Sequence, residues 1–432
     1  MVKVFNTKST KLDVIMDVVH TLGTTAITNA TASVRSIISD VKENGDAAII
    51  KYTNQFDRLN IKSIEELKVT EQEINAAFNS CSKDLIAALE FAAKRIEAYH
   101  IKQMPADFDY IDDDGVRLGN LWKPLRIAGL YVPGGTATYP SSVLMNAIPA
   151  RVAGVKELIM VTPTPDNLLN PAVLAAARIA GVTEIYKIGG AQAIAALALP
   201  GNSLPVADKI VGPGNAYVAA AKRELSSVVG IDMIAGPSEI LVVSDNKTSP
   251  AWIAADLLSQ AEHDENAQSI LITDDENYAN AVIAAAEEHL ATLPRAVIAR
   301  KSWENKGVVI IDPGFSNAIR LINHIAPEHL ELAVDNAEEM AKEVTNAGAI
   351  FLGRYTPEAI GDYTAGPSHV LPTSGTARFA SGLSVYDFLK RVSLIECTQA
   401  SFLRLATHTA NLADSEGLGA HALSVRVRNI AV

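Results

Sequence analysis

Histidines in the second half of the chain stand beside residues with which they could share chemistry. Seven of the nine histidines lie after residue 260. Four of them have a carboxylate or an amide nearby: Gln260 with His263, Glu328 with His329, Asp362 with His369, and Glu416 with His421. Imidazoles and carboxylates suit zinc and similar divalent ions, and they also transfer protons near neutral pH. The pattern therefore indicates a metal site, an acid–base site or both.

The first two of these pairs lie at predicted helix ends, where ordinary structural roles are also common. Gln260 and His263 are three residues apart near the end of a helix predicted over 250–265, so they share one helix face. A terminal histidine there can simply interact with the helix dipole and solvent. Pro327 is typical of a first helical position, and the same dipole would stabilise Glu328 just after it. For both pairs the structural and the chemical explanations stay open.

The other two pairs lie in a loop and in the C-terminal tail. Asp362 and His369 occur in a loop rich in glycine, proline, serine and threonine, and its low charge is unlike that of a disordered segment. Glu416 and His421 occur in the tail, where a histidine is usually solvated. The sequence alone leaves the roles of His369 and His324 open.

The composition favours a globular protein that binds neither nucleic acid nor membrane. Hydrophobic residues make up 48% of the chain, and its net charge is −12 without any basic run. The N-terminal residues lack the apolar core of a signal peptide, and no apolar run approaches the ~20 residues of a membrane span. We therefore expect a cytoplasmic protein. The two cysteines, Cys81 and Cys397, cannot form a Cys-rich zinc site, so a metal would need nitrogen and oxygen ligands.

The elements that must position these residues alternate between strands and helices. Residues 1–25 are predicted to form an arm, and residues 33–53 and 74–100 repeat apolar positions at helical spacing. From residue 126 onward, alanine-rich helices separate strand-like runs at 126–132, 157–163, 184–190, 209–214, 239–245, 269–275 and 307–312. This alternation predicts an α/β fold with parallel sheets covered by helices.

Four Gly/Pro turns near the ends of these strands are candidate ligand loops. They lie at 133–135, 189–190, 212–215 and 236–238. Ligands in open α/β sheets bind outside the carboxyl ends of the strands, and glycine lets the backbone approach them closely. Glycine also ends strands for purely structural reasons, so only the succession of four turns favours a ligand crevice. No G-x-G-x-x-G motif follows a strand, so motifs alone do not indicate a nucleotide cofactor.

Several segments together resemble the histidinol dehydrogenase family, in the family's order and over nearly the whole chain. They are LYVPGGTATYPSSVLMNAIPA, IGGAQAIAALA, DKIVGPGNAYV, DMIAGPSEILV, DLLSQAEHD, NHIAPEHLEL, GDYTAGPSHVLPTSGTARFASGLSVYDFLKR and EGLGAHA. The resemblance implies an enzyme that needs zinc and NAD and oxidises L-histidinol to L-histidine through histidinal, in two hydride transfers. It also implies a homodimer in which the tail of one subunit completes the site of the other.

The resemblance further implies roles for individual residues. The implied zinc ligands are Gln260, His263, Asp362 and His421. The implied acid–base pair is Glu328 and His329. The implied substrate site contains Ser238, Glu416, His329 and the zinc ligands. The implied NAD contacts are Tyr131, Gln192 and Asn215. The implied fold has two incomplete Rossmann-like domains, which we place as an arm at 1–25, a metal-carrying domain at 26–130 and 238–384, an inserted domain at 131–237 and a swapped tail at 385–432.

Two other classes of protein share part of this pattern. A zinc hydrolase of a small amine-containing metabolite would use the same ligands with a metal-bound water, but it would need no cofactor crevice. A metabolite-binding protein could share the α/β form, but it would lack the acid–base pair and would usually carry an export signal. A crevice beside an acid–base pair therefore favours the dehydrogenase.

Overall fold

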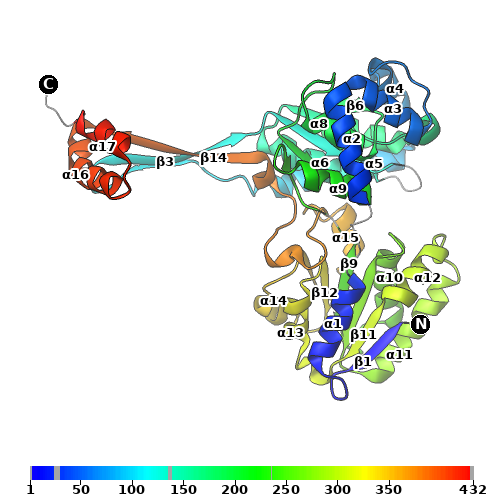
Figure 1. Ribbon diagram of the computed structural model, residues 1–432. Helices are drawn as coiled ribbons and strands as arrows, with labels where there is room; N and C mark the ends of the chain where they lie inside the picture. Colours follow the sequence, from blue (N-terminus) through cyan, green and yellow to red (C-terminus); the bar gives the residue numbers. More distant parts are fainter. Residues whose placement is uncertain (1, 24–29, 135–138, 235, 429–432) are drawn as a thin grey trace. The chain divides into compact units, whose positions relative to one another are not determined.

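The computed structural model describes residues 2–23, 30–134, 139–234 and 236–428 (Figure 1). Gly135 of the predicted turn at 133–135 lies outside the described residues. The chain divides into two compact units: Met1–Gln103 with Arg126–Phe388, and Met104–Leu125 with Leu389–Val432. Among the described residues, no helix combines the length and the apolar character that a membrane crossing requires.

A six-stranded parallel sheet forms one half of the first unit. Its strands, in spatial order, are β1 (Lys3–Asn6), β11 (Val308–Ile311), β10 (Gln268–Thr273), β9 (Glu239–Ser244), β12 (His329–Ala333) and β13 (Ala349–Leu352). Three of the predicted strand runs, at 239–245, 269–275 and 307–312, are confirmed as β9, β10 and β11. Within the segment predicted as an arm at 1–25, β1 pairs with β11, and the helix after it packs in the same core.

Helices cover both faces of this sheet, as Figure 1 shows. One face carries α1 (Leu12–Gly23), α13 (Ala318–Ile325) and α14 (Ala337–Glu343), and the other carries α10 (Pro250–Ala261), α11 (Glu276–Leu290) and α12 (Ala296–Lys306). Successive strand residues point to opposite faces, so Ile240 and Val242 pack on the second group and Leu241 and Val243 on the first. Burial on both faces explains the continuous apolar runs of the sequence.

A five-stranded parallel sheet forms the other half of the first unit. Its spatial order is β6 (Glu184–Tyr186), β5 (Glu157–Val161), β4 (Ile127–Tyr131), β7 (Lys209–Val211) and β8 (Gly230–Ile231). Numbered along the chain, this is the order 3-2-1-4-5, which lacks only the last strand of the Rossmann sheet. The strands β11-β10-β9-β12-β13 of the other sheet repeat it. The prediction of two incomplete Rossmann-like folds is therefore confirmed.

The helices between residues 31 and 101 pack with the five-stranded sheet, which differs from the predicted domain boundary. That boundary placed 26–130 with the metal-carrying sheet. Instead, α2 (Thr31–Asn44) and α3 (Asp46–Asp57) pack on the five-stranded sheet with α8 (Gly190–Ala198) and α9 (Ala216–Leu225). A second group contains α4 (Glu71–Ser80), α5 (Lys83–Ile101), α6 (Pro140–Ala153) and α7 (Pro171–Ala180). The buried valines and isoleucines of α2 and α3 decide their partner, and sequence periodicity cannot show which sheet they meet.

Each of the two long helices predicted near the N-terminus is in fact a pair of helices. Gly45 separates α2 from α3 with a φ of 50°, a conformation that favours glycine, and a Cβ there would collide with the carbonyl oxygen of Gly201. Ser82 begins α5 by accepting the N–H of Leu85, as an N-cap residue does. Apolar spacing continues across both breaks, which is why spacing alone missed them.

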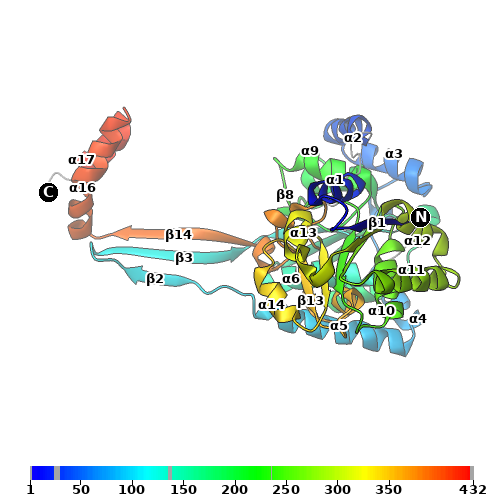
Figure 2. The same cartoon turned by 90° about the horizontal axis from the view of Figure 1, so that it is seen from below.

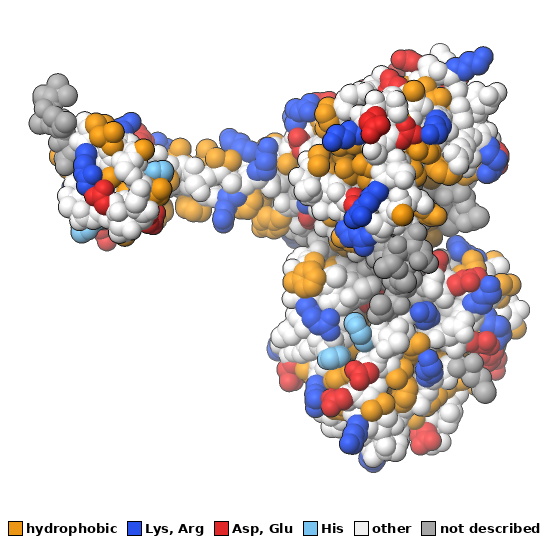
Figure 3. Space-filling model, in the orientation of Figure 1, with side chains coloured by type: hydrophobic (Ala, Val, Ile, Leu, Met, Phe, Trp, Pro, Cys, Tyr) orange, Lys and Arg blue, Asp and Glu red, His pale blue; other side chains and the backbone are white. Residues whose placement is uncertain are grey.

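The second unit joins residues 104–125 to the C-terminal tail. Its elements are strands β14 (Leu389–Cys397), β3 (Val116–Pro124) and β2 (Phe108–Ile111) with helices α16 (Gln399–Ser415) and α17 (Gly419–Arg426). Figure 2 shows the three strands side by side. Because β14 pairs with β3 along its whole length, the predicted tail boundary at 385 left out its partner strands. Apolar side chains on these strands are exposed (Figure 3).

Candidate active site

Glu328 and His329 lie at the amino end of a central strand, and the predicted helix start at Pro327 is wrong. His329 is the first residue of β12, which lies between β9 and β13. The leucines that follow it are buried in the sheet core, so strand packing overrides the helix signal of the proline. The site therefore occupies the amino edge of this sheet, although ligands of open α/β sheets usually bind at the carboxyl edge.

The backbone of Glu239, the first residue of β9, holds both members of the pair. Its N–H donates to Glu328 Oε2 at 2.9 Å, and its carbonyl oxygen lies 3.0 Å from His329 Nδ1. A carbonyl only accepts, so Nδ1 carries the ring proton and donates it there, and it cannot also accept from Gln260 Nε2, which lies 3.0 Å away. His329 Nε2 is then left with a lone pair, and this buried atom has no hydrogen-bond partner. The neutral imidazole thus presents a basic nitrogen to the site.

Gln260 and His263 reach the same edge from the end of α10. Gln260 lies in the last turn and is fully buried, and His263 follows the helix by two residues. Gln260 Nε2 lies 3.0 Å from both Glu358 Oε1 and His329 Nδ1, whereas its Oε1 is buried without a partner. The carboxyl end of a helix carries partial negative charge, so this position favours a cation.

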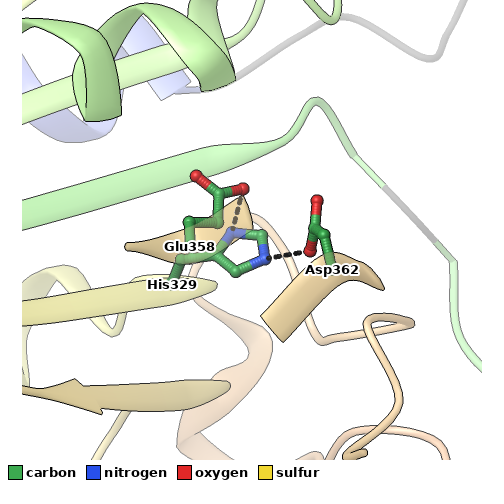
Figure 4. Close-up of side chains that lie close together, drawn as sticks. All are labelled: His329, Glu358 and Asp362. Atoms are coloured by element: carbon green, nitrogen blue, oxygen red, sulfur yellow. Dashed lines mark ion pairs between the residues drawn. The ribbon is translucent and has the colours of Figure 1, made fainter. Parts of the chain in front are cut away.

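A short helix, α15 (Glu358–Tyr363), supplies two carboxylates to the cluster. Glu358 and Asp362 are four residues apart, so they share one face of the helix, and both contact His329 (Figure 4). Glu358 was missed from the sequence. The sequence signal for Glu358 was its spacing of four residues to Asp362, directly after Pro357, the residue that precedes the helix.

His329, Glu358 and Asp362 offer metal-ligand atoms within 4.8 Å of one another, but a single ion does not suit all three. Glu358 Oε1 lies 3.4 Å from Nδ1, and Asp362 Oδ1 lies 3.8 Å from Nε2. The two carboxylates thus meet opposite edges of the ring (Figure 4). Nδ1 already donates to the carbonyl oxygen of Glu239, so Glu358 lies beside the ring nitrogen that is not available to a metal ion. Asp362 lies beside Nε2, the ring nitrogen that has no hydrogen-bond partner.

Burial dominates the electrostatics of the cluster. It raises the pKa of Glu328 and Glu358 well above the usual carboxyl range and that of Asp362 to about 7. It lowers the pKa of His329 to about 3. Among the described residues, no lysine or arginine forms an ion pair with these carboxylates. A bound cation would reverse this balance by stabilising the ionised carboxylates.

His369, whose role the sequence left open, ties this cluster to the other sheet. Its Nδ1 lies 3.0 Å from the carbonyl oxygen of Asp362, so Nδ1 donates there and Nε2 accepts from the Ser142 hydroxyl at 3.3 Å. Ser142 belongs to α6. His324, by contrast, is exposed and lines a small cavity with His20 and Arg378.

The three residues expected at the cofactor lie around the carboxyl edge of the five-stranded sheet. Tyr131 ends β4, and its hydroxyl accepts the N–H of Gly190 at 3.1 Å. Gln192, in the first turn of α8, has a buried Oε1 without a partner. Asn215 caps α9 by accepting the N–H groups of Tyr217 and Val218. The strand order reverses between β4 and β7, where such sheets bind their ligands.

A buried ion pair braces the turn after β7. Lys222 Nζ donates to Asp232 Oδ1 at 2.5 Å and to the carbonyl oxygen of Gly212 at 2.8 Å, and Asp232 Oδ2 accepts the N–H of Gly212. Gly212 has a φ of 110°, and a Cβ there would collide with the carbonyl oxygen of Tyr131. The turn is therefore rigid and passes close to β4.

The remaining expected site residues lie outside the His329 cluster. Ser238 precedes β9, is half-buried and accepts the N–H of Gln268 through its carbonyl oxygen. Glu416 and His421 belong to the second unit: Glu416 caps the end of α16, and His421 lies in α17, and both are exposed. The structure brings together Gln260, Glu328, His329 and Asp362, with His263 close behind them.

Comparison with known proteins decides the family. The histidinol dehydrogenase family model matches residues 22–429. Histidinol dehydrogenase 1 of Nostoc sp. is 55% identical over 408 residues, which cover 93% of each chain. The chain belongs to the histidinol dehydrogenase family. It is also 54% identical to the histidinol dehydrogenase of Gluconobacter oxydans, over 91% of this chain and 92% of that one.

A solved histidinol dehydrogenase has the same fold. The crystal structure of the enzyme from Elizabethkingia anophelis superposes with a TM-score of 0.92 at 37% identity, covering 99% of this chain and 98% of that chain. Membership of the histidinol dehydrogenase family makes the chain an oxidoreductase of histidine biosynthesis and sets aside the hydrolase alternative.

Replacing Glu328 with glutamine should stabilise the metal-free protein near pH 8, because burial disfavours the ionised carboxylate. Its folded-state pKa lies above its unfolded value, so the stability linked to this group is present at low pH and is lost as the pH rises. The amide cannot ionise, and its oxygen can still accept the N–H of Glu239. Urea unfolding of both proteins near pH 8 and near pH 4 measures the difference, which should vanish near pH 4.

Glu338→Gln, on the exposed face of α14, is the control. It should change stability by less than about 0.5 kcal/mol at either pH. An equal gain from Glu328→Gln at both pH values would contradict the assigned shift of the Glu328 pKa.

Proposed function

We propose that this chain oxidises L-histidinol to L-histidine through histidinal, with one zinc ion and two molecules of NAD. The observation that carries the proposal is the gathering of two buried polar atoms without hydrogen-bond partners, Gln260 Oε1 and His329 Nε2. They lie beside carboxylates that form no ion pair with a lysine or arginine among the described residues. Unpaired buried polar atoms are costly unless something binds them. A divalent cation and a polar substrate together would supply the missing partners.

The residues present fit a zinc ion held by nitrogen and oxygen. Gln260, His263 and Asp362 come from the first unit, and His421 comes from the second. Zinc accepts such ligands, and the end of α10 favours the positive charge. Cysteine is not required, since Cys81 is half-buried between α4 and α5 and Cys397 is exposed at the end of β14.

The chain's own residues can move the protons of the reaction. When bound, zinc orients the imidazole and amine of the substrate, and NAD accepts a hydride in each of two steps. His329 Nε2 takes the hydroxyl proton in the first step, because its lone pair faces the site while Nδ1 is fixed by Glu239. Glu328, held by the N–H of Glu239, activates the water that the aldehyde must add before the second hydride leaves.

The cofactor crevice is proposed at the switch point between β4 and β7. The strand order of the five-stranded sheet supports it, and Tyr131, Gln192 and Asn215 surround that edge. The start of α9 there is a natural site for a phosphate. Because the reaction draws on dissolved NAD and histidinol, we place the enzyme in the cytoplasm, without nucleic acid or membrane as a partner.

We further propose a homodimer in which the second unit completes the site of the partner. Glu416 and His421 are the expected substrate and zinc residues in that unit. Its strands expose large apolar side chains, with Phe108 57%, Ile111 71% and Ile395 70% exposed. Apolar patches of this kind are typical of protein–protein interfaces.

The first test of the reaction is its stoichiometry. Purified protein should form about two NADH per histidinol consumed, because an alcohol becomes an acid in two hydride transfers. Absorbance of NADH at the end of the reaction, with histidinol limiting, measures the ratio. A ratio near one with free aldehyde accumulating would rule out the four-electron oxidation.

The second test separates the two steps. Glu328→Gln should impair oxidation of histidinal more than oxidation of histidinol, because only the aldehyde step needs an activated water. His329→Asn should slow both steps, because each releases a proton to Nε2. Pre-steady-state traces started from histidinol and from histidinal separate the steps. Equal losses in Glu328→Gln would mean that the carboxylate is only structural.

The third test concerns the shared site. Inactive Asp362→Asn chains and inactive His421→Phe chains are mixed and allowed to exchange subunits. In a heterodimer with shared sites, both lesions fall in one site and the other site is intact. Random mixing makes about half of the dimers heterodimers, so roughly a quarter of the unmodified activity should return.

Subunit exchange is confirmed independently, for example by mass spectrometry of differently labelled chains. With exchange confirmed, no recovery of activity would show that each site is built from one chain. Either parent variant exchanged with itself is the matched control and should stay inactive.

A further inference from the structure

Glu358 is a buried carboxylate to which the proposed reaction gives no role. It is 2% exposed, and its Oε1 lies 3.0 Å from Gln260 Nε2 and 3.4 Å from His329 Nδ1. Its backbone N–H donates to Glu331 Oε1 at 2.6 Å, which fixes the first turn of α15. Burying a carboxylate this deeply is costly, so its contact with Gln260 is the feature to explain.

The side-chain amide of Gln260 has two orientations that exchange its oxygen and its nitrogen. In the structure the nitrogen faces Glu358, and the buried oxygen faces away from Glu358 without a partner. An ionised carboxylate, the form that a bound cation stabilises, only accepts hydrogen bonds. The flipped amide would set its oxygen against Glu358 Oε1 and would turn N–H groups toward the place of the cation. Glu358 therefore favours the orientation that a metal ligand needs, in opposition to the protonated His329 Nδ1, which lies 3.0 Å from the same amide nitrogen.

We infer that Glu358 is a positioning residue that holds Gln260 Oε1 toward the metal ion. The inference rests on the proposed function, because it requires a cation at this site. In this inference α15 contributes to the metal site twice. Asp362 is a proposed metal ligand, and Glu358, on the same face of the helix, orients Gln260, a second proposed ligand. Partners that orient metal ligands in this way typically change metal affinity by about 10- to 100-fold.

Glu358→Gln should weaken zinc binding by about 10- to 100-fold. The introduced amide keeps the shape of the side chain, but it can donate as well as accept, so Gln260 is no longer restricted to one orientation. Zinc affinity is measured on the full chain by competition with a chromophoric chelator, without substrate or turnover. Thermal unfolding of the metal-free variants reports whether they are folded.

Glu331→Gln is the matched control for the loss of buried charge. Its amide oxygen can still accept the N–H of Glu358, and Glu331 makes no hydrogen bond to Gln260. Its zinc affinity should stay close to that of the unmodified chain. Equal losses in the Glu331 and Glu358 variants would attribute the effect to charge and would overturn the positioning role.

Exchanging the two groups gives a rescue. In the double variant Glu358→Gln with Gln260→Glu, the introduced amide donates to one introduced carboxylate oxygen and leaves the other for zinc. This variant should recover most of the lost affinity. The single variant Gln260→Glu sets two carboxylates against each other and should bind zinc less tightly than the double variant, a comparison that does not depend on folding of Glu358→Gln alone.

The outcomes separate this inference from the proposed function. If the unmodified chain binds no zinc, the proposed metal site falls and the inference falls with it. If the unmodified chain binds zinc and Glu358→Gln binds it equally well, only the inference is overturned. Failure of the exchanged pair to bind more tightly than Gln260→Glu would also overturn it.

Discussion

The burial of several carboxylates around one neutral imidazole is the constraint on which the rest of the site depends. Glu328, Glu358 and Asp362 all surround His329, and no described lysine or arginine pairs with them. Desolvation raises the pKa of each of these carboxyl groups. Such a cluster destabilises the metal-free fold as the pH rises, and a divalent cation offsets that cost. Stability and metal binding are therefore linked through the same side chains.

The choice of sheet edge follows from the charge of the groups to be bound. At the amino edge of the six-stranded sheet the helix α10 ends, and its carboxyl-terminal dipole favours a cation. At the carboxyl edge of the five-stranded sheet the helix α9 begins, and its N–H groups favour an anionic phosphate. The two sheets share one topology, but the site proposed on one favours a cation and the site proposed on the other favours an anion. This difference suits the proposed binding of zinc at one and of a dinucleotide at the other.

The sequence predicted the strands well because both faces of each sheet are covered, so strands such as β9 are unbroken apolar runs. It failed at 327–330, where proline and glutamate imitate a helix start and only the pairing of β12 between two strands decides the structure. Family motifs located Gln260, Glu328, His329 and Asp362, which the fold brings together. Glu358 was missed because its importance lies in a contact across 98 residues, which no local pattern records.

The proposed ligand set also explains why the C-terminal tail contains a proposed metal-binding residue, His421. Catalytic zinc sites typically have three protein ligands and an open position. Gln260, His263 and Asp362 would already provide three from the first unit. If His421 of the partner subunit adds a fourth, metal binding would depend on association of the subunits. By thermodynamic linkage, association must favour metal binding by the same free energy as metal binding favours association. The dimer would then be part of the zinc site rather than a separate stabilising device.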